Sequence, residues 1–336
     1  MHYRIGIART VLLRAQLLDP TWLNQQAAAR MKPVAGRSRS ALRNRIEYAI
    51  AAGFVATLRY PPRLIAERLA RFYVNLLDLA VPRLRRIALR NLELAMPDRT
   101  LEERQRIADG VFRSLARVLV AVARLPDLTH ENIHEWIVHD GLEHLREAQR
   151  RGKGVLVATG HLGNWELSVN AHTLLCGDTM SVVVRPLDNP LIDDFVRRRR
   201  ELFGNRMIGK KEFVRSLLKA LHAGETAAML VDQNNMLDQG VFVDFFGIPA
   251  RTGTSFAKIA AHTGAAVVPG FAVWIDAEQR YRLKFYPPLD MTGDIVEDTR
   301  RVQAAIERAI REYPDQWLWI HRRWKARPEG QPDLYK

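Results

Sequence analysis

The sequence is poor in cysteine and has no long hydrophobic run. Its single cysteine, Cys176, excludes an internal disulfide and fits a reducing compartment. An uninterrupted run of about 18 apolar residues is missing, so we expect no transmembrane helix. Residues 1–18 carry scattered arginines and have no small-residue cleavage site after an apolar core, which argues against a signal peptide.

Acidic residues are outnumbered by basic ones. The 336 residues include 51 Lys and Arg against 37 Asp and Glu, a formal net charge of +14. This balance favours anionic partners, such as lipid headgroups, an acidic carrier protein or nucleic acid. Because neither an aromatic platform nor a known RNA-binding module is evident, we do not expect a nucleic-acid partner. A hydrophobic content of 47% is sufficient for a buried core.

The stretch that organises the chain is 153–166, Lys-Gly-Val-Leu-Val-Ala-Thr-Gly-His-Leu-Gly-Asn-Trp-Glu. Residues 155–158 predict a buried strand, and residues 162–175 a helix. His161 therefore lies on a strand-to-helix turn, where ligands bind in open α/β folds. A separation of five residues would place His161 and Glu166 about 140° apart on one helix, so they can meet only if His161 precedes it. A neutral imidazole there can accept a proton from an alcohol, and a carboxylate on its other nitrogen would fix the tautomer.

Strand and helix patterns alternate over most of the chain. They predict an α/β fold with a mostly parallel twisted sheet, covered by helices on both faces. The expected strands are 136–139, 155–158, 180–184, 226–231, 242–247, 265–273 and 281–285, and the expected helices are 101–124, 140–151, 162–175, 190–203, 212–223, 255–262 and 295–312. Thr100 and Glu103 fit a capping box for the helix over 101–124.

The sequence also resembles a known family. His161-Leu-Gly-Asn-Trp-Glu166 is similar to the His-x4-Asp/Glu block of the glycerolipid acyltransferase superfamily, and more narrowly of the late acyltransferases of lipid A biosynthesis, the lauroyl and myristoyl transferases. Further blocks agree in order over roughly residues 45–326: Arg185–Pro190, Asp232-Gln233, Val243–Thr252, Val267–Pro269 and Trp319–Lys325.

The resemblance implies an enzyme that moves a fatty acyl chain from acyl carrier protein to a hydroxyl of a lipid A precursor, in lipopolysaccharide biosynthesis. His161 would be the general base and Glu166 its partner. The remaining expected site residues are Arg185, Asp232, Gln233, Arg251 and Thr252 for substrate binding, with Gly163 and Asn164 at the oxyanion turn. Residues 251–255 are expected to open the next helix, and an ion pair with Asp188 or Asp193 is the alternative for Arg185. The four arginines of 197–200 point all around a helix, so we expect a solvated or carrier-facing surface there. Neither a metal nor another cofactor is expected.

Four regions are expected along the chain: a basic irregular segment (1–45), a helical membrane-associating region (46–125), the α/β acyltransferase domain (126–326) and a tail (327–336). The membrane expectation rests on arginines beside apolar helix faces, which suit an anionic interface. The resemblance places such proteins at the cytoplasmic face of the inner membrane.

Several alternatives stay open at this point. The same chemistry would serve another glycolipid or a lysophospholipid as acceptor, and a basic peripheral-membrane protein without activity would share the composition. His130-Glu-Asn-Ile-His134 formally matches a zinc-hydrolase motif, but Pro126 and Thr129 place it in a loop or at a helix start. The tryptophans of residues 317–324 fit either an interfacial belt or a core.

Overall fold

The computed structural model describes residues 40–209, 213–234 and 240–336, and the chain divides into two units, Met1–Asn44 and Arg45–Lys336. Most of the expected basic segment and the residues weighed as a signal peptide lie outside the described residues. Of the first unit, the described residues 40–44 lead into helix α3 (Ala41–Arg59), so the expected irregular segment does not extend to residue 45. Within the described ranges, no helix is long and apolar enough to cross a membrane.

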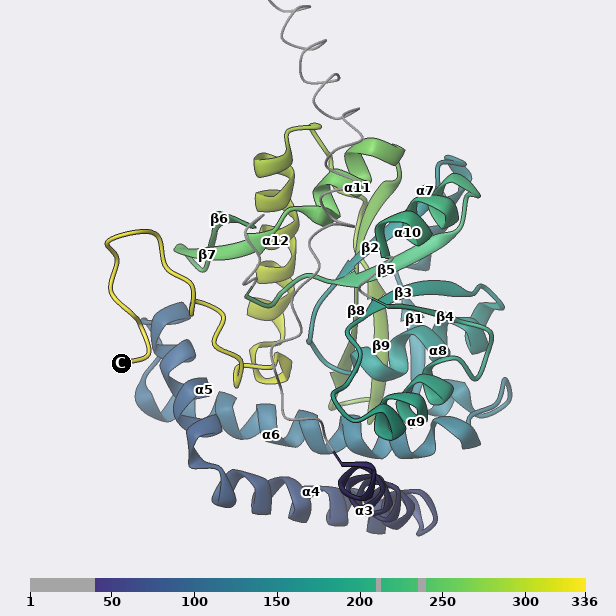
Figure 1. Cartoon of the computed structure of the whole chain (residues 1–336), viewed down its shortest axis with the longest axis vertical. Helices are drawn as coiled ribbons and strands as arrows, with labels where there is room; N and C mark the ends of the chain where they lie inside the picture. The colour runs from purple at the N-terminus through teal and green to yellow at the C-terminus, as the bar shows by residue number, and fades with distance from the viewer. Residues whose placement is uncertain (1–39, 210–212, 235–239) are drawn as a thin grey trace, which may run out of the picture. The chain divides into compact units, whose positions relative to one another are not determined.

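A seven-stranded sheet forms the centre of the second unit, with the strand order β1-β9-β8-β2-β5-β3-β4 (Figure 1). Its strands are β1 (Ile137–Asp140), β2 (Val155–Thr159), β3 (Met180–Val184), β4 (Arg206–Gly209), β5 (Thr226–Leu230), β8 (Ala266–Ile275) and β9 (Arg280–Phe285). Every neighbouring pair is parallel except β8 and β9. The expectation of a mostly parallel sheet in an α/β fold is confirmed.

Helices pack on the sheet from both sides. They are α6 (Leu101–Arg124), α7 (Leu142–Arg150), α8 (Trp165–Cys176), α9 (Pro190–Arg200), α10 (Phe213–His222), α11 (Ser255–Thr263) and α12 (Ile295–Glu312). Val155 and Val157 of β2 share a core with residues of α7 and α8. Leu156 points the opposite way, because side chains alternate along a strand, and it is buried on the other side of the sheet, where α12 contacts β2 and α11 contacts both α10 and α12.

The unbroken apolar run of β2 follows from its central position in the sheet. Residues 155–158 are buried, because the strand lies between β8 and β5 and is covered on both faces. A half-exposed strand would alternate apolar and polar residues instead. The buried run places the end of β2, and with it His161, at the carboxyl edge of the sheet.

The N-terminal part of the second unit is helical, as expected, with α4 (Arg63–Ala80) and α5 (Pro82–Ala95) following α3. Ala66, Ala70 and Val74 recur every four residues on α4 and share a core with α6. The capping box of α6 is confirmed, since Thr100 accepts from the Glu103 N–H and the Glu103 carboxylate accepts from the Thr100 N–H.

The C-terminal segment is packed into the fold. Trp317, Trp319 and Trp324 are at most 1% exposed, so they belong to the core rather than to an interfacial belt. The expected tail over 327–336 is tied down as well, because the Tyr335 hydroxyl donates to Oδ1 of Asn91 at 2.7 Å. Asn91 in turn donates to the Trp319 carbonyl.

Two features of the fold were not predicted. The short edge strand β4 falls within residues 204–211, for which we expected no element. Strand β6 (Gly240–Phe245) was expected, but its partner β7 (Ile248–Gly253) was not, and the two form a separate antiparallel hairpin. β7 contains a proline and an arginine, so its apolar alternation is weak.

Candidate active site

The turn after β2 brings His161 close to the end of the neighbouring strand β5. A Cβ added to Gly160 would lie 2.9 Å from Cγ of Asp232, so only glycine leaves room for this approach. The Val231 N–H donates to the Thr159 carbonyl at 3.0 Å, which continues the β2–β5 pairing up to the turn. The residues that follow the two strands are therefore held side by side.

Asp232 contacts His161 twice. The backbone N–H of His161 donates to Oδ2 of Asp232 at 2.7 Å, and Nδ1 of the ring lies 2.9 Å from Oδ1. Because a carboxylate only accepts hydrogen bonds, Nδ1 carries the ring proton when the imidazole is neutral. The lone pair is then on Nε2, the nitrogen required for proton abstraction.

A third donor completes the environment of the carboxylate. Nε1 of Trp317 donates to Oδ2 of Asp232 at 2.8 Å. The Asp232 side chain is 1% exposed, whereas that of His161 is 22% exposed. Buried carboxylates are unfavourable unless hydrogen bonds satisfy them, and these three donors do so. Trp317 was not predicted as a site residue, since it lies 85 residues from Asp232 in the chain.

The charges in this pair shift both pKa values. Burial alone would raise the pKa of Asp232, but the His161 ring and the three hydrogen bonds lower it to about 2. Burial alone would lower the pKa of His161, but the charge and hydrogen bond of Asp232 raise it above 6.5. Glu166 contributes a smaller electrostatic effect in the same direction. The pair thus favours an imidazolium, the species that a general base forms during proton transfer.

Glu166 is not the carboxylate in contact with Nδ1 of His161, contrary to the expected pairing. It forms a bidentate ion pair with Arg200, with Oε1 to Nη2 at 2.6 Å and Oε2 to Nε at 2.8 Å. The reason is positional: Glu166 lies on the first turn of α8, whereas Asp232 follows the strand adjacent to β2. The sequence did not reveal this ion pair, since Arg200 is expected with its neighbours on a solvated or carrier-facing surface.

Gly163 and Asn164 build the turn rather than an open anion site. Gly163 has φ +65°, and an added Cβ would lie 1.9 Å from the Ala272 carbonyl oxygen. The N–H of Gly163 donates to the Gln316 carbonyl, and that of Asn164 to the Ala272 carbonyl. Both N–H groups are thus occupied, which argues against the expected oxyanion role. Asn164 instead caps α8 by accepting from the Leu167 N–H.

Two expected substrate residues lie at the same edge of the sheet. Gln233 is exposed, and its Nε2 lies 3.4 Å from Nε2 of His161, a long contact that a substrate hydroxyl can replace. Arg185 is also exposed and directly follows β3. Because β3 is two strands away from β2, Arg185 starts about 10 Å from the turn of His161. Within the described ranges Arg185 forms no ion pair, so the alternative of a pair with Asp188 or Asp193 finds no support.

Arg251 and Thr252 lie in β7, not at the start of a helix as expected. Thr252 is 2% exposed, and its hydroxyl accepts from Nη2 of the buried Arg323 at 2.6 Å while donating to the Ala250 carbonyl. A hydroxyl engaged in this way is not available to a substrate. For Arg251, which is half-buried, substrate binding stays a prediction.

The zinc-hydrolase motif is not on a helix. His130 lies in a turn and its Nδ1 is 2.6 Å from the Leu174 carbonyl oxygen, while His134 lies in a three-residue 3-10 helix. Residues i and i+4 share a face only in a longer α-helix, so this segment does not present the two imidazoles as that motif requires.

The fold and this edge of the sheet define an α/β enzyme whose histidine–carboxylate pair is suited to proton abstraction. Comparison with known proteins gives the family. The chain belongs to the bacterial lipid A biosynthesis acyltransferases, which it matches over residues 36–326. Its activity is therefore acyl transfer in lipid A biosynthesis.

Relatives agree with this assignment. The lipid A biosynthesis palmitoleoyltransferase and lauroyltransferase of Escherichia coli K12 are each 30% identical to this chain, covering 74% of it and 81% and 82% of their own lengths. The lipid A biosynthesis myristoyltransferase of the same organism is 27% identical, covering 82% of this chain and 85% of its own length. The resemblance noted in the sequence is confirmed.

The contact with Asp232 predicts the titration of His161. The ring should titrate above 6.5 in the wild-type protein, as followed by NMR of the imidazole nitrogens and assigned with His161→Gln. In Asp232→Asn the charge is lost while burial persists, so the pKa should fall below 6.5. Glu166→Gln should lower it less. An unchanged pKa in Asp232→Asn would contradict the described pairing.

Proposed function

We propose that this enzyme transfers a fatty acyl chain from an acyl carrier protein thioester to a hydroxyl of a lipid A precursor, with His161 as general base. The observation that carries the proposal is the double contact between His161 and Asp232, which leaves Nε2 as the basic nitrogen. Family membership supports the acyl transfer and the lipid A acceptor.

The proposed reaction needs no acyl-enzyme intermediate. Nε2 of His161 takes the proton of the acceptor hydroxyl as its oxygen attacks the thioester carbonyl. The new C–O ester bond forms and the C–S bond breaks, and the proton passes from the imidazolium to the departing thiolate. Asp232 stabilises the imidazolium in between, and Trp317 positions Asp232. Glu166, held by Arg200, adds negative potential near the ring.

Two side chains near His161 and the net charge of the chain support the two proposed substrates. Arg185 is exposed and follows a strand that ends about 10 Å from the end of β2, so it could contact a phosphate on a disaccharide acceptor. Gln233 lies beside Nε2 of His161, where it would contact the reacting hydroxyl. The net charge of +14 suits an acidic carrier protein as donor.

Acyl transfer in detergent micelles tests the chemistry. Purified protein is given a panel of acyl carrier protein thioesters and a tetra-acylated lipid A precursor, beside His161→Ala. Removal of a general base should lower the rate roughly 10²-fold or more. Because the neutral ring is the base and its pKa is raised, kcat/KM should increase with pH through a pKa above 6.5. Equal rates in both proteins would refute the role of His161. Transfer only to another glycolipid would refute the proposed acceptor.

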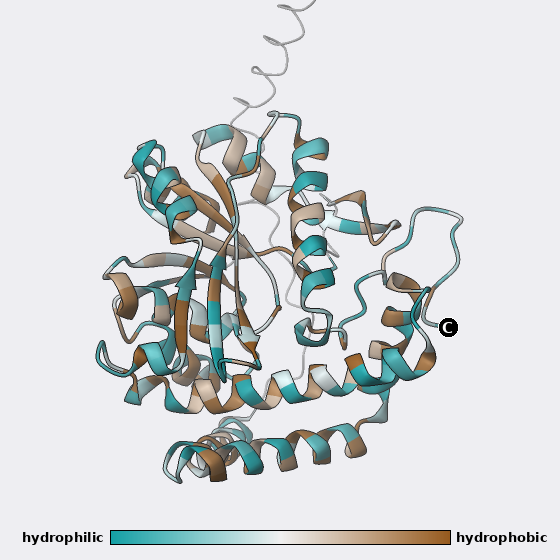
Figure 2. Ribbon diagram, turned by 180° about the vertical axis from the view of Figure 1, so that it is seen from behind, coloured by the Kyte–Doolittle hydropathy of each residue, from teal (hydrophilic) through white to brown (hydrophobic). Residues whose placement is uncertain are grey.

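We also propose that α4 attaches the enzyme to an anionic membrane surface, at the cytoplasmic face of the inner membrane. The face of α4 opposite to its buried alanines carries Ile65, Phe72, Leu76 and Leu79, which are 47–78% exposed. Apolar and polar residues alternate along this helix in Figure 2. Exposed Arg68 and Arg71 lie beside the apolar face, as in helices that lie in a lipid interface.

Vesicle binding tests the role of α4. Replacing Leu76 and Leu79 with aspartate removes two apolar side chains from the interface and adds repulsion from anionic lipid. Since burial of one leucine contributes about 1.5–3 kcal/mol, affinity for vesicles with phosphatidylglycerol should fall more than about tenfold. Val296→Asp, at a position of α12 about as exposed as Leu76, is the control. Unchanged binding of the double variant would refute the attachment through α4.

A further inference from the structure

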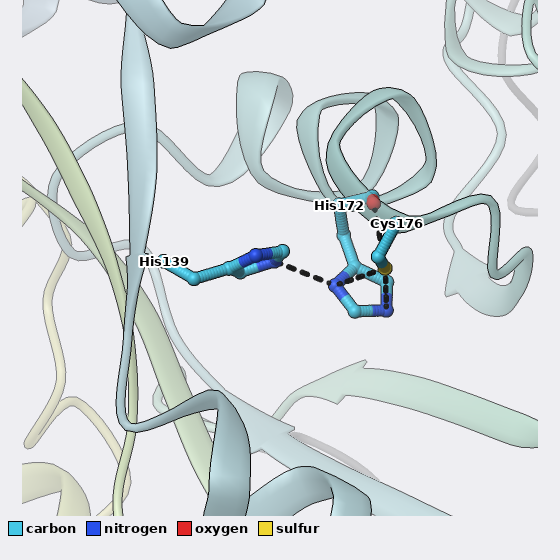
Figure 3. Close-up of side chains that lie close together, drawn as sticks. All are labelled: His139, His172 and Cys176. Carbon is cyan, nitrogen blue, oxygen red and sulfur yellow. Dashed lines mark hydrogen bonds between the residues drawn. The ribbon is translucent and has the colours of Figure 1, made fainter.

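A second group of chemistry-bearing side chains lies away from His161. His172 and Cys176 are four residues apart on α8, and His139 comes from β1 (Figure 3). Their candidate ligand atoms all lie within 4.8 Å of one another. The acyl-transfer mechanism uses none of the three residues.

The topology separates this cluster from the catalytic turn. β1 is parallel to β9, β9 is antiparallel to β8, and β8 is parallel to β2, so β1 ends at the edge opposite to His161. His172 is seven residues beyond Trp165, where α8 begins, which corresponds to about 10 Å along the helix. Any role of the cluster is therefore distinct from proton transfer at His161.

The distances approach those between ligands of a tetrahedral metal ion. Nε2 of His139 lies 3.0 Å from Nδ1 of His172, and Sγ of Cys176 lies 3.6 Å from the same Nδ1. Around zinc, bond lengths of about 2.05 Å to nitrogen and 2.3 Å to sulfur place two nitrogens about 3.3 Å apart and a nitrogen and a sulfur about 3.5 Å apart. Sγ also lies 3.5 Å from Nε2 of His172, and all three ligand atoms are within 4.8 Å of one another, so side-chain rotations would direct them at one ion.

The surroundings favour a bound ion over isolated polar groups. His172 is fully buried, while His139 and Cys176 are half-buried. Without an ion, the two rings share a single hydrogen bond, in which one nitrogen donates and the other accepts. The Cys176 thiol, a weak donor, is directed at the His172 carbonyl at 3.0 Å.

A carboxylate stands on the far side of the His172 ring. Oδ2 of Asp178 lies 3.8 Å from Nε2 of His172, just beyond hydrogen-bond distance. Arg146 and Gln149 both donate to this oxygen and hold it in place. With Nδ1 on a metal, Nε2 carries the proton and can donate to Asp178, as carboxylates commonly orient the histidines of zinc sites.

We propose that His139, His172 and Cys176 bind a zinc-class divalent metal ion through Nε2, Nδ1 and Sγ, with Asp178 orienting His172. Binding displaces the thiol proton of Cys176 to solvent and forms the metal–sulfur bond. Water would supply the fourth ligand. The ion would join β1 to the end of α8.

Cobalt(II) titration tests the site without any assay of activity. The full chain, without a histidine tag, is freed of metal and titrated with Co²⁺, whose bond to a thiolate gives a near-ultraviolet charge-transfer band. Because Cys176 is the only cysteine, this band can come from no other residue of the chain. The wild type should show the band with one ion per chain, and added Zn²⁺ should abolish it.

Variants identify the ligands. Cys176→Ser should remove the band, and His139→Gln should weaken cobalt affinity more than about tenfold. His134→Gln, from the zinc-hydrolase pattern, should leave both unchanged. Circular dichroism verifies that each variant is folded. Absence of the band in the wild type would refute the site and leave a hydrogen-bonded pair of neutral histidines, and unaltered affinity in His139→Gln would refute its role as ligand.

Discussion

The candidate active site depends on the contact between a buried carboxylate and a partly exposed imidazole. Asp232 holds both the backbone N–H and Nδ1 of His161, so a single side chain fixes the turn and the tautomer together. Such an arrangement is unfavourable in a protein interior unless every polar atom is satisfied, and Trp317 supplies the remaining donor. The packed C-terminal segment thus contributes to the edge that carries the proposed base, although it is far from His161 in sequence.

The strand order of the sheet places the residues of this contact side by side. β2 and β5 are parallel neighbours in register, Thr159 opposite Leu230, so the residues that follow them meet at one edge. Gly160 leaves space for the carboxylate, and Gly163 turns the chain into α8. The family assignment gives acyl transfer in lipid A biosynthesis, and the geometry supplies a histidine–carboxylate pair that suits the proposed proton abstraction.

Much of this arrangement could be predicted from the sequence, but the identity of the carboxylate on Nδ1 could not. Apolar runs and helical periodicity are local signals, and they located β2, β3, α6 and α12 closely. Which strand lies beside β2 is a long-range property, because β5 comes some 70 residues later. Proximity in sequence therefore favoured Glu166 as the partner of His161, whereas the strand order gives Asp232. For the same reason, the sequence did not reveal the ion pair between Arg200 and Glu166 or the contact between His139 and His172.

The most direct test of the account compares Asp232→Asn with Glu166→Gln in the acyl-transfer assay, with folding verified by thermal unfolding. If Asp232 fixes the tautomer and stabilises the imidazolium, Asp232→Asn should lower kcat by roughly 10²-fold or more and lower the pKa that governs the rate. Glu166→Gln should then have the smaller effect on that pKa. An Asp232→Asn enzyme with wild-type kcat and pH profile, beside an inactive Glu166→Gln enzyme, would contradict the account and return the role of partner to Glu166.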